Sequence, residues 1–112
     1  MRVNDIRLTE HFSLREFECR CCKRVKLHPA LVAKLQKLRK MWQRPLVLTS
    51  GYRCALHNAE VGGALRSKHL TGSAADICVM ARDQTYFRLL ALSCGFSKVL
   101  LYEDRNFAHV EV

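Results

Sequence analysis

Residues 67–77 read SKHLTGSAADI. This stretch places His69 in a loop, and Gly72 permits the chain to turn sharply before a strand predicted over Ala74–Val79. Side chains alternate between the two faces of a strand, so Asp76 lies on one defined face. The stretch therefore predicts a loop histidine that is followed closely by a carboxylate on a strand.

The end of the chain predicts a strand, a turn and a second strand. Val99–Tyr102 and Phe107–Val112 are rich in residues that favour strands, and the polar residues 103–106 between them favour a turn. Alternation along the last strand places His109 and Glu111 on the same face.

Three side chains on separate segments form a candidate metal site: His69, Asp76 and His109. If the strands of Asp76 and His109 are neighbours in one sheet, the three groups can converge on one point. Two imidazoles and a carboxylate are ligand types of a catalytic zinc ion, and three protein ligands leave a fourth position open for water. The chain contains five histidines, so the spacing alone also fits ordinary surface or core histidines.

The other predicted elements are spread along the chain. They are a short helix with a capping box at Ser13–Glu16, a helix over Pro29–Trp42, a strand over Leu46–Thr49, a long structured loop with about one helical turn over Cys54–Thr71, and a helix from Asp83 to Gly95. The helices are predicted from their capping residues and from apolar residues at helical spacing. With 112 residues, the chain is long enough to bury one core and short for two.

Composition and charge narrow the class of protein. The longest apolar runs contain a handful of residues, whereas a membrane-spanning helix needs about 20. Residues Met1–Asp5 lack an apolar segment and a small-residue cleavage site, so no signal peptide is predicted. The net charge of +9 favours an anionic partner, which could be nucleic acid, a membrane face or bacterial cell wall.

Several motifs together resemble one known family. They are SGYR at 50–53, HN at 57–58, VGG at 61–63, SKHLTGSAADI at 67–77 and HVE at 109–111. In this order they resemble the zinc D-alanyl-D-alanine carboxypeptidase family, which includes L-alanyl-D-glutamate endolysins of bacteriophages and is related in structure to the signalling domain of hedgehog proteins. The opening FSLREF at 12–17 is similar to short, single-domain members found in phages and prophages.

The resemblance implies a small α+β fold, with helices packed on one side of an antiparallel sheet. It implies one zinc peptidase domain over residues 1–112, which hydrolyses amide bonds in peptidoglycan stem peptides as a D,D-carboxypeptidase or an endopeptidase. His69, Asp76 and His109 are then the zinc ligands. Arg53 is expected to bind the substrate and stabilise the oxyanion, and Ser67 to support the site. A salt-bridging arginine and an ordinary turn serine are the alternatives.

The general base is where the chain departs from some relatives. In phage endopeptidases and D-Ala-D-Ala dipeptidases, an acid lies three residues before the last histidine ligand, where this chain has Asn106. In other members a glutamate lies six residues before that ligand, which is Glu103 here, but the histidine that accompanies it is replaced by Phe107. We therefore expect Glu103 to be the base, followed by Asp104 and then by Glu111.

The chain has six cysteines, which leave two interpretations open. A second, structural zinc site could form among Cys19, Cys21, Cys22, Cys54 and His57, with the set Cys19/Cys21/Cys54/His57 as one choice. Because their spacing is irregular and no signal peptide is predicted, reduced loop thiols are the favoured alternative. Cys78 and Cys94 are expected to be small buried hydrophobic residues.

Two other functions remain open beside the peptidase. A non-catalytic relative could keep the metal and bind a cell-wall peptide or a protein partner, as Asn106 and Phe107 would allow. A basic zinc module that binds nucleic acid is disfavoured, because the sequence lacks a paired Cys-x-x-Cys framework and an aromatic stacking platform. We expect one catalytic zinc (Zn²⁺), peptidoglycan as the partner, no nucleic acid, a monomer, and action on the wall after release from the host cytoplasm or from the virion.

Overall fold

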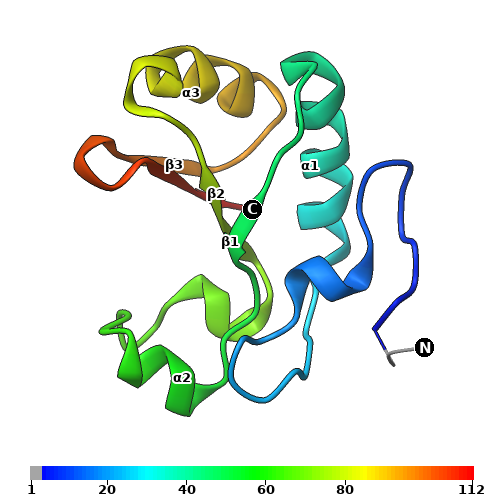
Figure 1. Cartoon of the computed structure of the whole chain (residues 1–112), viewed down its shortest axis with the longest axis vertical. Helices are drawn as coiled ribbons and strands as arrows, with labels where there is room; N and C mark the ends of the chain where they lie inside the picture. The colour runs from blue at the N-terminus through cyan, green and yellow to red at the C-terminus, as the bar shows by residue number, and fades with distance from the viewer. Residues whose placement is uncertain (1–3) are drawn as a thin grey trace.

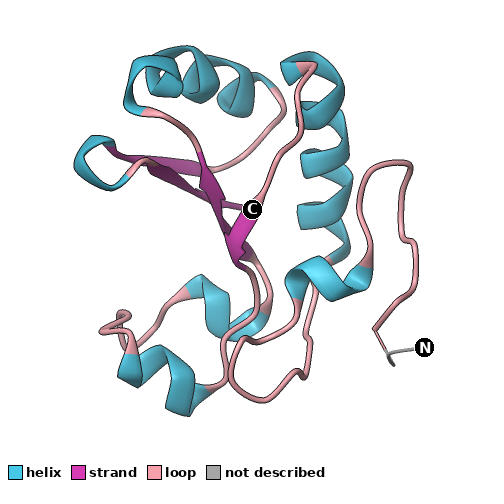
Figure 2. Cartoon of the chain, in the orientation of Figure 1, coloured by secondary structure: helices cyan, strands magenta, loops and turns pink. Residues whose placement is uncertain are grey.

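The fold is built on a four-stranded antiparallel sheet (Figures 1 and 2). The computed structural model describes residues 4–112. The strands are β1 (Leu48–Ser50), β2 (Ala74–Cys78), β3 (Lys98–Tyr102) and β4 (Phe107–Glu111), in the order β1-β2-β4-β3. The helices are α1 (Pro29–Trp42), α2 (Ala55–Glu60) and α3 (Gln84–Ser93), joined by the 3₁₀ turns η1 (Leu14–Phe17), η2 (Lys68–Thr71), η3 (Ala81–Asp83) and η4 (Glu103–Arg105).

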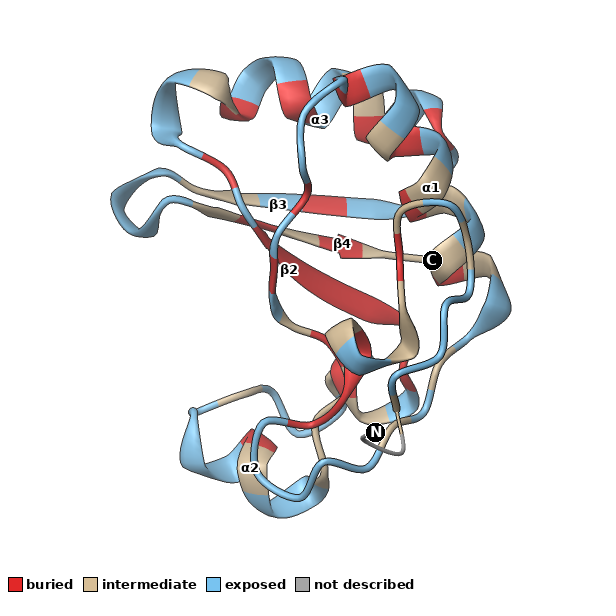
Figure 3. Cartoon of the chain, turned by 45° about the vertical axis from the view of Figure 1, so that its right-hand side comes forward, coloured by how far each residue is buried: buried red, intermediate tan, exposed pale blue. Residues whose placement is uncertain are grey.

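Helices α1 and α3 enclose the hydrophobic core against the sheet. Helix α1 spans the predicted residues, because apolar side chains recur along it at helical spacing and Gln43 ends it in the left-handed conformation. Its buried side chains are Leu31, Leu35, Leu38 and Trp42. The Trp42 ring meets the Phe87 ring of α3 edge-on, with 5.4 Å between centroids. Figure 3 colours the buried positions of both helices red.

The two faces of the sheet have different roles. Asp76 of β2 pairs with His109 of β4, which confirms that the two strands are neighbours. The residues on either side of this pair belong to the hydrophobic core; they are Ala75, Ile77, Ala108 and Val110. Because side chains alternate along a strand, Asp76 and His109 project from the opposite face. The helices and core therefore lie on one side of the sheet, and the candidate metal site lies on the other.

The segment 54–71 differs from the expected loop, because it contains α2 and η2. Helix α2 lacks an apolar face that periodicity could reveal: Leu56 is 63% exposed, and Asn58 is the buried residue. The helix begins after Cys54, whose Sγ accepts the N–H of His57 at 3.4 Å. A thiol is not one of the usual capping groups, so this helix start gave no recognisable signal.

None of the helices in residues 4–112 combines the length and the apolar character needed to span a bilayer.

Gly72 occupies a position that other residues fit poorly. Its φ is +71°, which confirms the predicted sharp turn, and an added Cβ would overlap the Lys26 carbonyl. We expect Gly72→Ala to lower the free energy of unfolding by about 3 kcal/mol or more, measured by denaturant unfolding.

Gly62 provides the matched control for this substitution. Its φ is +70°, but an added Cβ would meet nothing within 4 Å. Gly62→Ala should therefore show the backbone cost alone, about 1 kcal/mol. Equal losses for the two variants would rule out a steric contribution from Lys26.

Candidate metal centre and active site

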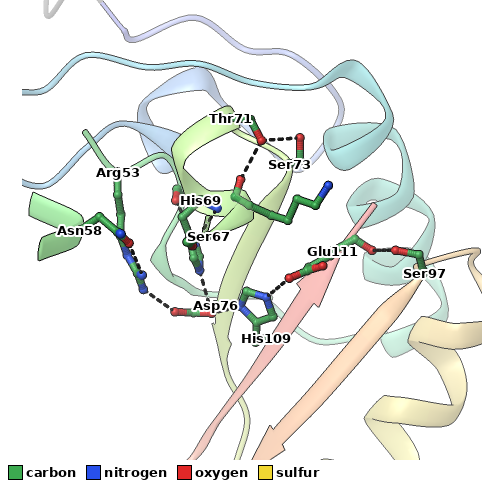
Figure 4. Close-up of polar contacts among 12 residues, drawn as sticks. Arg53, Asn58, Ser67, His69, Thr71, Ser73, Asp76, Ser97, His109 and Glu111 are labelled. Carbon is green, nitrogen blue, oxygen red and sulfur yellow. Dashed lines mark hydrogen bonds and ion pairs between the residues drawn. The ribbon is translucent and has the colours of Figure 1, made fainter. Parts of the chain in front are cut away.

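Asp76 lies between two histidines on the polar face of the sheet (Figure 4). Its Oδ1 is 3.2 Å from Nε2 of His69 and 2.8 Å from Nδ1 of His109. The ligand atoms of the three residues all lie within 4.8 Å of one another. The structure therefore brings together, from η2, β2 and β4, the three side chains that the sequence singled out.

The ring of His69 is buried and held in one orientation. Its Nδ1 lies 2.7 Å from the Gly51 carbonyl oxygen, which can only accept a hydrogen bond, so Nδ1 carries a proton. Gly51 packs closely on η1, since an added Cβ would lie 2.8 Å from the Phe17 backbone. The Ser67 hydroxyl oxygen accepts the backbone N–H of His69 at 3.2 Å. These contacts leave Nε2 of the ring facing Asp76.

A carboxylate orients His109. The Nε2 of His109 donates to Oε1 of Glu111 at 2.9 Å, so a neutral ring presents its Nδ1 lone pair to Asp76. Burial lowers the pKa of His109, but the hydrogen bonds to Asp76 and Glu111 raise it by more, so the net shift is upward. Glu111, the third candidate base, therefore contacts the ring edge that faces away from Asp76.

These outer contacts suit the centre to a cation. With both outer nitrogens donating, lone pairs of His69 Nε2, His109 Nδ1 and Asp76 Oδ1 converge, and either protons or a metal ion must offset them. When protons occupy the centre, burial raises the pKa of Asp76, but hydrogen bonds from His109 and His69 lower it by more and hold it well below its usual range. Two imidazoles and an ionised carboxylate are a donor set that suits zinc.

Arg53 binds the second oxygen of Asp76. Its Nη2 donates to Asp76 Oδ2 at 3.0 Å. Its Nε donates to the Ser50 hydroxyl at 3.0 Å, and its Nη1 donates to Asn58 Oδ1 at 3.3 Å. Of the five N–H groups of a guanidinium, these contacts within residues 4–112 use three and leave two for a ligand. The sequence assigned no role to Ser50 or Asn58, although both belong to the SGYR and HN motifs.

The site opens into a cleft of about 780 Å³. The lining includes the three candidate metal ligands and Ser67, and four basic side chains, which are Arg53, Arg66, Lys98 and Arg105. Within residues 4–112, the carboxylates of the lining come from Asp76 and Glu111 alone. This excess of positive charge favours an anionic ligand.

Glu103 and Asp104 lie beside the cleft and outside its lining as defined over residues 4–112. Both are exposed residues of η4. Asn106 ends this turn with a φ of +52°, and its Oδ1 accepts the N–H of Ala81 at 3.0 Å. Asparagine tolerates the left-handed conformation, so the position that holds an acid in some relatives serves the turn here.

The structure also brings three cysteines together. Ligand atoms of Cys19, Cys22 and Cys54 lie within 4.8 Å of one another. His57, which the sequence offered as a further ligand, is outside this group as found in residues 4–112. Its Nδ1 lies 3.9 Å from a Glu60 carboxylate oxygen, and the side chain lines the cleft beside the candidate metal site.

Of the three remaining cysteines, Cys21, which the sequence also offered as a ligand, is exposed and outside this group as found in residues 4–112. The other two differ in burial. Cys94 is buried, as predicted, but Cys78 is exposed. The prediction for Cys78 was wrong because alternation along β2 places it with Asp76 on the cleft side of the sheet, where it contributes to the cleft lining.

Comparisons with known proteins agree with the motifs. A model of the Peptidase M15 family matches residues 10–111. The zinc D-Ala-D-Ala carboxypeptidase of Streptomyces albus G is 34% identical over 68 residues, which cover 60% of this chain and 27% of that protein. The chain thus spans well under half the length of this relative, whereas the family match covers nearly all of the chain. From this match and these motifs, the chain belongs to the Peptidase M15 family.

Proposed function

We propose that the chain is a zinc-dependent peptidase that hydrolyses amide bonds in the stem peptides of bacterial peptidoglycan. The observation that carries the proposal is the convergence of His69 Nε2, Asp76 Oδ1 and His109 Nδ1. The other nitrogen of each histidine ring is held by a hydrogen bond, to the Gly51 carbonyl or to Glu111. Family membership and the similarity to a zinc D-Ala-D-Ala carboxypeptidase support the same chemistry.

His69, Asp76 and His109 would hold the zinc ion, which when bound acts as a Lewis acid toward the scissile carbonyl and lowers the pKa of a water molecule. The protein itself supplies the rigidity of the ligands. Gly51 and Glu111 fix the two rings, and Arg53 fixes the carboxylate through its second oxygen. Ligands held in this way need little rearrangement during the reaction.

Arg53 has a proposed second role as a substrate-binding and catalytic residue. Its two remaining N–H groups belong to a side chain that lines the cleft, where they can donate to the scissile carbonyl oxygen or to a terminal carboxylate. Ser67 also lines the cleft. Its hydroxyl, which accepts the backbone N–H of His69, is therefore also a proposed substrate contact. The basic lining complements a peptide that carries carboxylates.

Glu103 is the proposed general base, which accepts a proton from the attacking water and passes it to the leaving amine. Glu111 suits this role less well, because its carboxylate already accepts the Nε2–H of His109. No hydrogen bond or ion pair within residues 4–112 holds the Glu103 side chain. It is therefore free to turn from η4 toward the cleft when a substrate is bound.

The test is hydrolysis of purified peptidoglycan, followed by turbidity and by muropeptide release with and without a chelator. We expect the chelator to abolish hydrolysis and added zinc to restore it. Chelator-insensitive hydrolysis would contradict a metal mechanism. Binding without cleavage by zinc-loaded protein would instead favour the non-catalytic relative. The masses of the released products separate D,D-carboxypeptidase from endopeptidase action.

Glu111 is proposed to position His109, and this role can be tested by zinc affinity. Glu111→Ala should weaken zinc binding about 10- to 100-fold, because His109 loses the acceptor that turns Nδ1 toward Asp76. Glu111→Gln keeps an acceptor oxygen and should recover most of the affinity. Competition with a chromogenic chelator measures both variants.

The matched control for Glu111 is Glu10→Ala, which removes an exposed carboxylate in the N-terminal segment. It should leave zinc affinity unchanged. Wild-type zinc affinity in Glu111→Ala would contradict the positioning role.

A further inference from the structure

Away from the active-site cleft, thiols from two distant segments meet. The sulfur atoms of Cys19, Cys22 and Cys54 lie within 4.8 Å of one another. Sulfur ligands of a tetrahedral zinc ion are about 3.8 Å apart, given a Zn–S distance of about 2.3 Å. Small rotations of the side chains would therefore bring the three sulfurs to the spacing of a metal site.

The fourth thiol of this region is that of Cys21. It is exposed, and partial loss of hydration together with the neighbouring Cys54 and Cys19 thiols raises its pKa. Within residues 4–112 its sulfur is outside the group of three, although its side chain interacts with the Cys54 thiol. Cys21 would have to turn toward the three sulfurs to become a fourth ligand.

The backbone around Cys19 forms a closed loop. The Lys23 N–H donates to the Cys19 carbonyl at 3.0 Å, and the Cys19 N–H donates to the Arg24 carbonyl at 2.7 Å. Lys23 has a φ of +62°, a conformation uncommon for residues other than glycine. The Cys54 N–H points at Cys19 Sγ, with 3.5 Å between nitrogen and sulfur. The loop thus holds the thiol of Cys19 at a fixed place beside Cys54.

The local electrostatics favour thiolates at this place. Burial raises the pKa of Cys19, but the N–H groups of Cys22, Cys54 and Cys21 lower it by more, to about 7. The loop also carries several positive side chains, which are Arg20, Lys23, Arg24 and Lys26. Thiolates that lie close together repel one another, and a bound cation would offset this repulsion.

We propose that Cys19, Cys22 and Cys54 bind a structural zinc ion, with Cys21 as the fourth ligand. Cys19 and Cys22 have the C-x-x-C spacing typical of structural zinc sites. The ion would tie the loop after η1 to the start of α2. Because Cys54 directly follows Arg53, the ion would also hold Arg53 in place, and Arg53 contacts Asp76.

The test uses the full-length chain, reduced, loaded with zinc and freed of excess metal. We expect two zinc ions per chain in the wild type and one in Cys22→Ser, which changes an exposed thiol. Asp76→Asn should also keep one zinc ion per chain, at the cysteine cluster. With cobalt in place of zinc, the wild type and Asp76→Asn should show the intense near-ultraviolet band of cobalt–thiolate bonds. Cys22→Ser should lose most of it.

Cys78→Ser is the matched control for the cobalt–thiolate band, because it removes an exposed thiol outside the cluster and should keep that band. One zinc ion per wild-type chain without a cobalt–thiolate band would overturn the proposal. A disulfide among these cysteines in protein purified under reducing conditions, or iron in place of zinc, would overturn it too. The proposed peptidase activity is judged separately, since the thiolate band does not depend on hydrolysis.

Discussion

Asp76→Asn is expected to remove zinc from the active site and to lower peptidoglycan hydrolysis at least about 1000-fold. Both oxygens of Asp76 are used, one toward His69 Nε2 and His109 Nδ1 and the other by Arg53. A neutral amide keeps the size of the side chain but is a poor zinc ligand. The lost polarisation is worth several kcal/mol, and each 1.4 kcal/mol is about tenfold in rate. Metal content and muropeptide release measure the two effects.

The amide can still accept a hydrogen bond from Arg53, so the fold should survive and circular dichroism should match the wild type. Asp83→Asn is the matched control. The Asp83 carboxylate pairs with Arg44 at 3.4 Å, beside α3 on the core side of the sheet, and its loss should leave zinc and activity unchanged. Normal hydrolysis by zinc-loaded Asp76→Asn would contradict the proposed metal centre.

The parts of the fold that the sequence predicted are those that bury one apolar face. Helix α1 and the paired strands β2 and β4 each place apolar side chains at a regular spacing, and this regularity is visible in the sequence. Helix α2 lacks such a face. Strand β1 begins at Leu48 instead of Leu46, and its pairing with β2 is irregular between Leu48 and Ser50, so alternation gave no reliable boundary.

The residues of the candidate site also differ in how well the sequence predicts them. The candidate ligands His69, Asp76 and His109 are distinctive side chains in recognisable motifs. The groups that orient them are harder to predict, because one is the backbone carbonyl of Gly51, which has no side-chain signal. The cysteine cluster was obscured for a related reason: Cys21 interrupts the C-x-x-C pair, and Cys54 approaches it only through the fold.

Glu103→Gln is expected to lower kcat about 10²- to 10⁴-fold, the usual contribution of a general base. Glutamine cannot accept the proton of the attacking water, but it has nearly the size of glutamate. Because Glu103 is exposed and lies outside the metal ligands, zinc content and KM should stay near wild-type values. Single-turnover hydrolysis of muropeptides, with metal analysis of the same samples, separates these quantities.

Two neighbouring variants decide among the carboxylates. If Glu103→Gln is fully active and Asp104→Asn is not, the base is Asp104, since both residues lie on η4. If Glu111→Gln loses kcat without losing zinc, Glu111 transfers the proton in addition to orienting His109. Glu10→Gln, an exposed carboxylate remote in sequence from η4, controls for a general loss of negative charge. Full activity in all three acidic variants of the site region would mean that a group other than these carboxylates accepts the proton, and Glu103 would have no part in the mechanism.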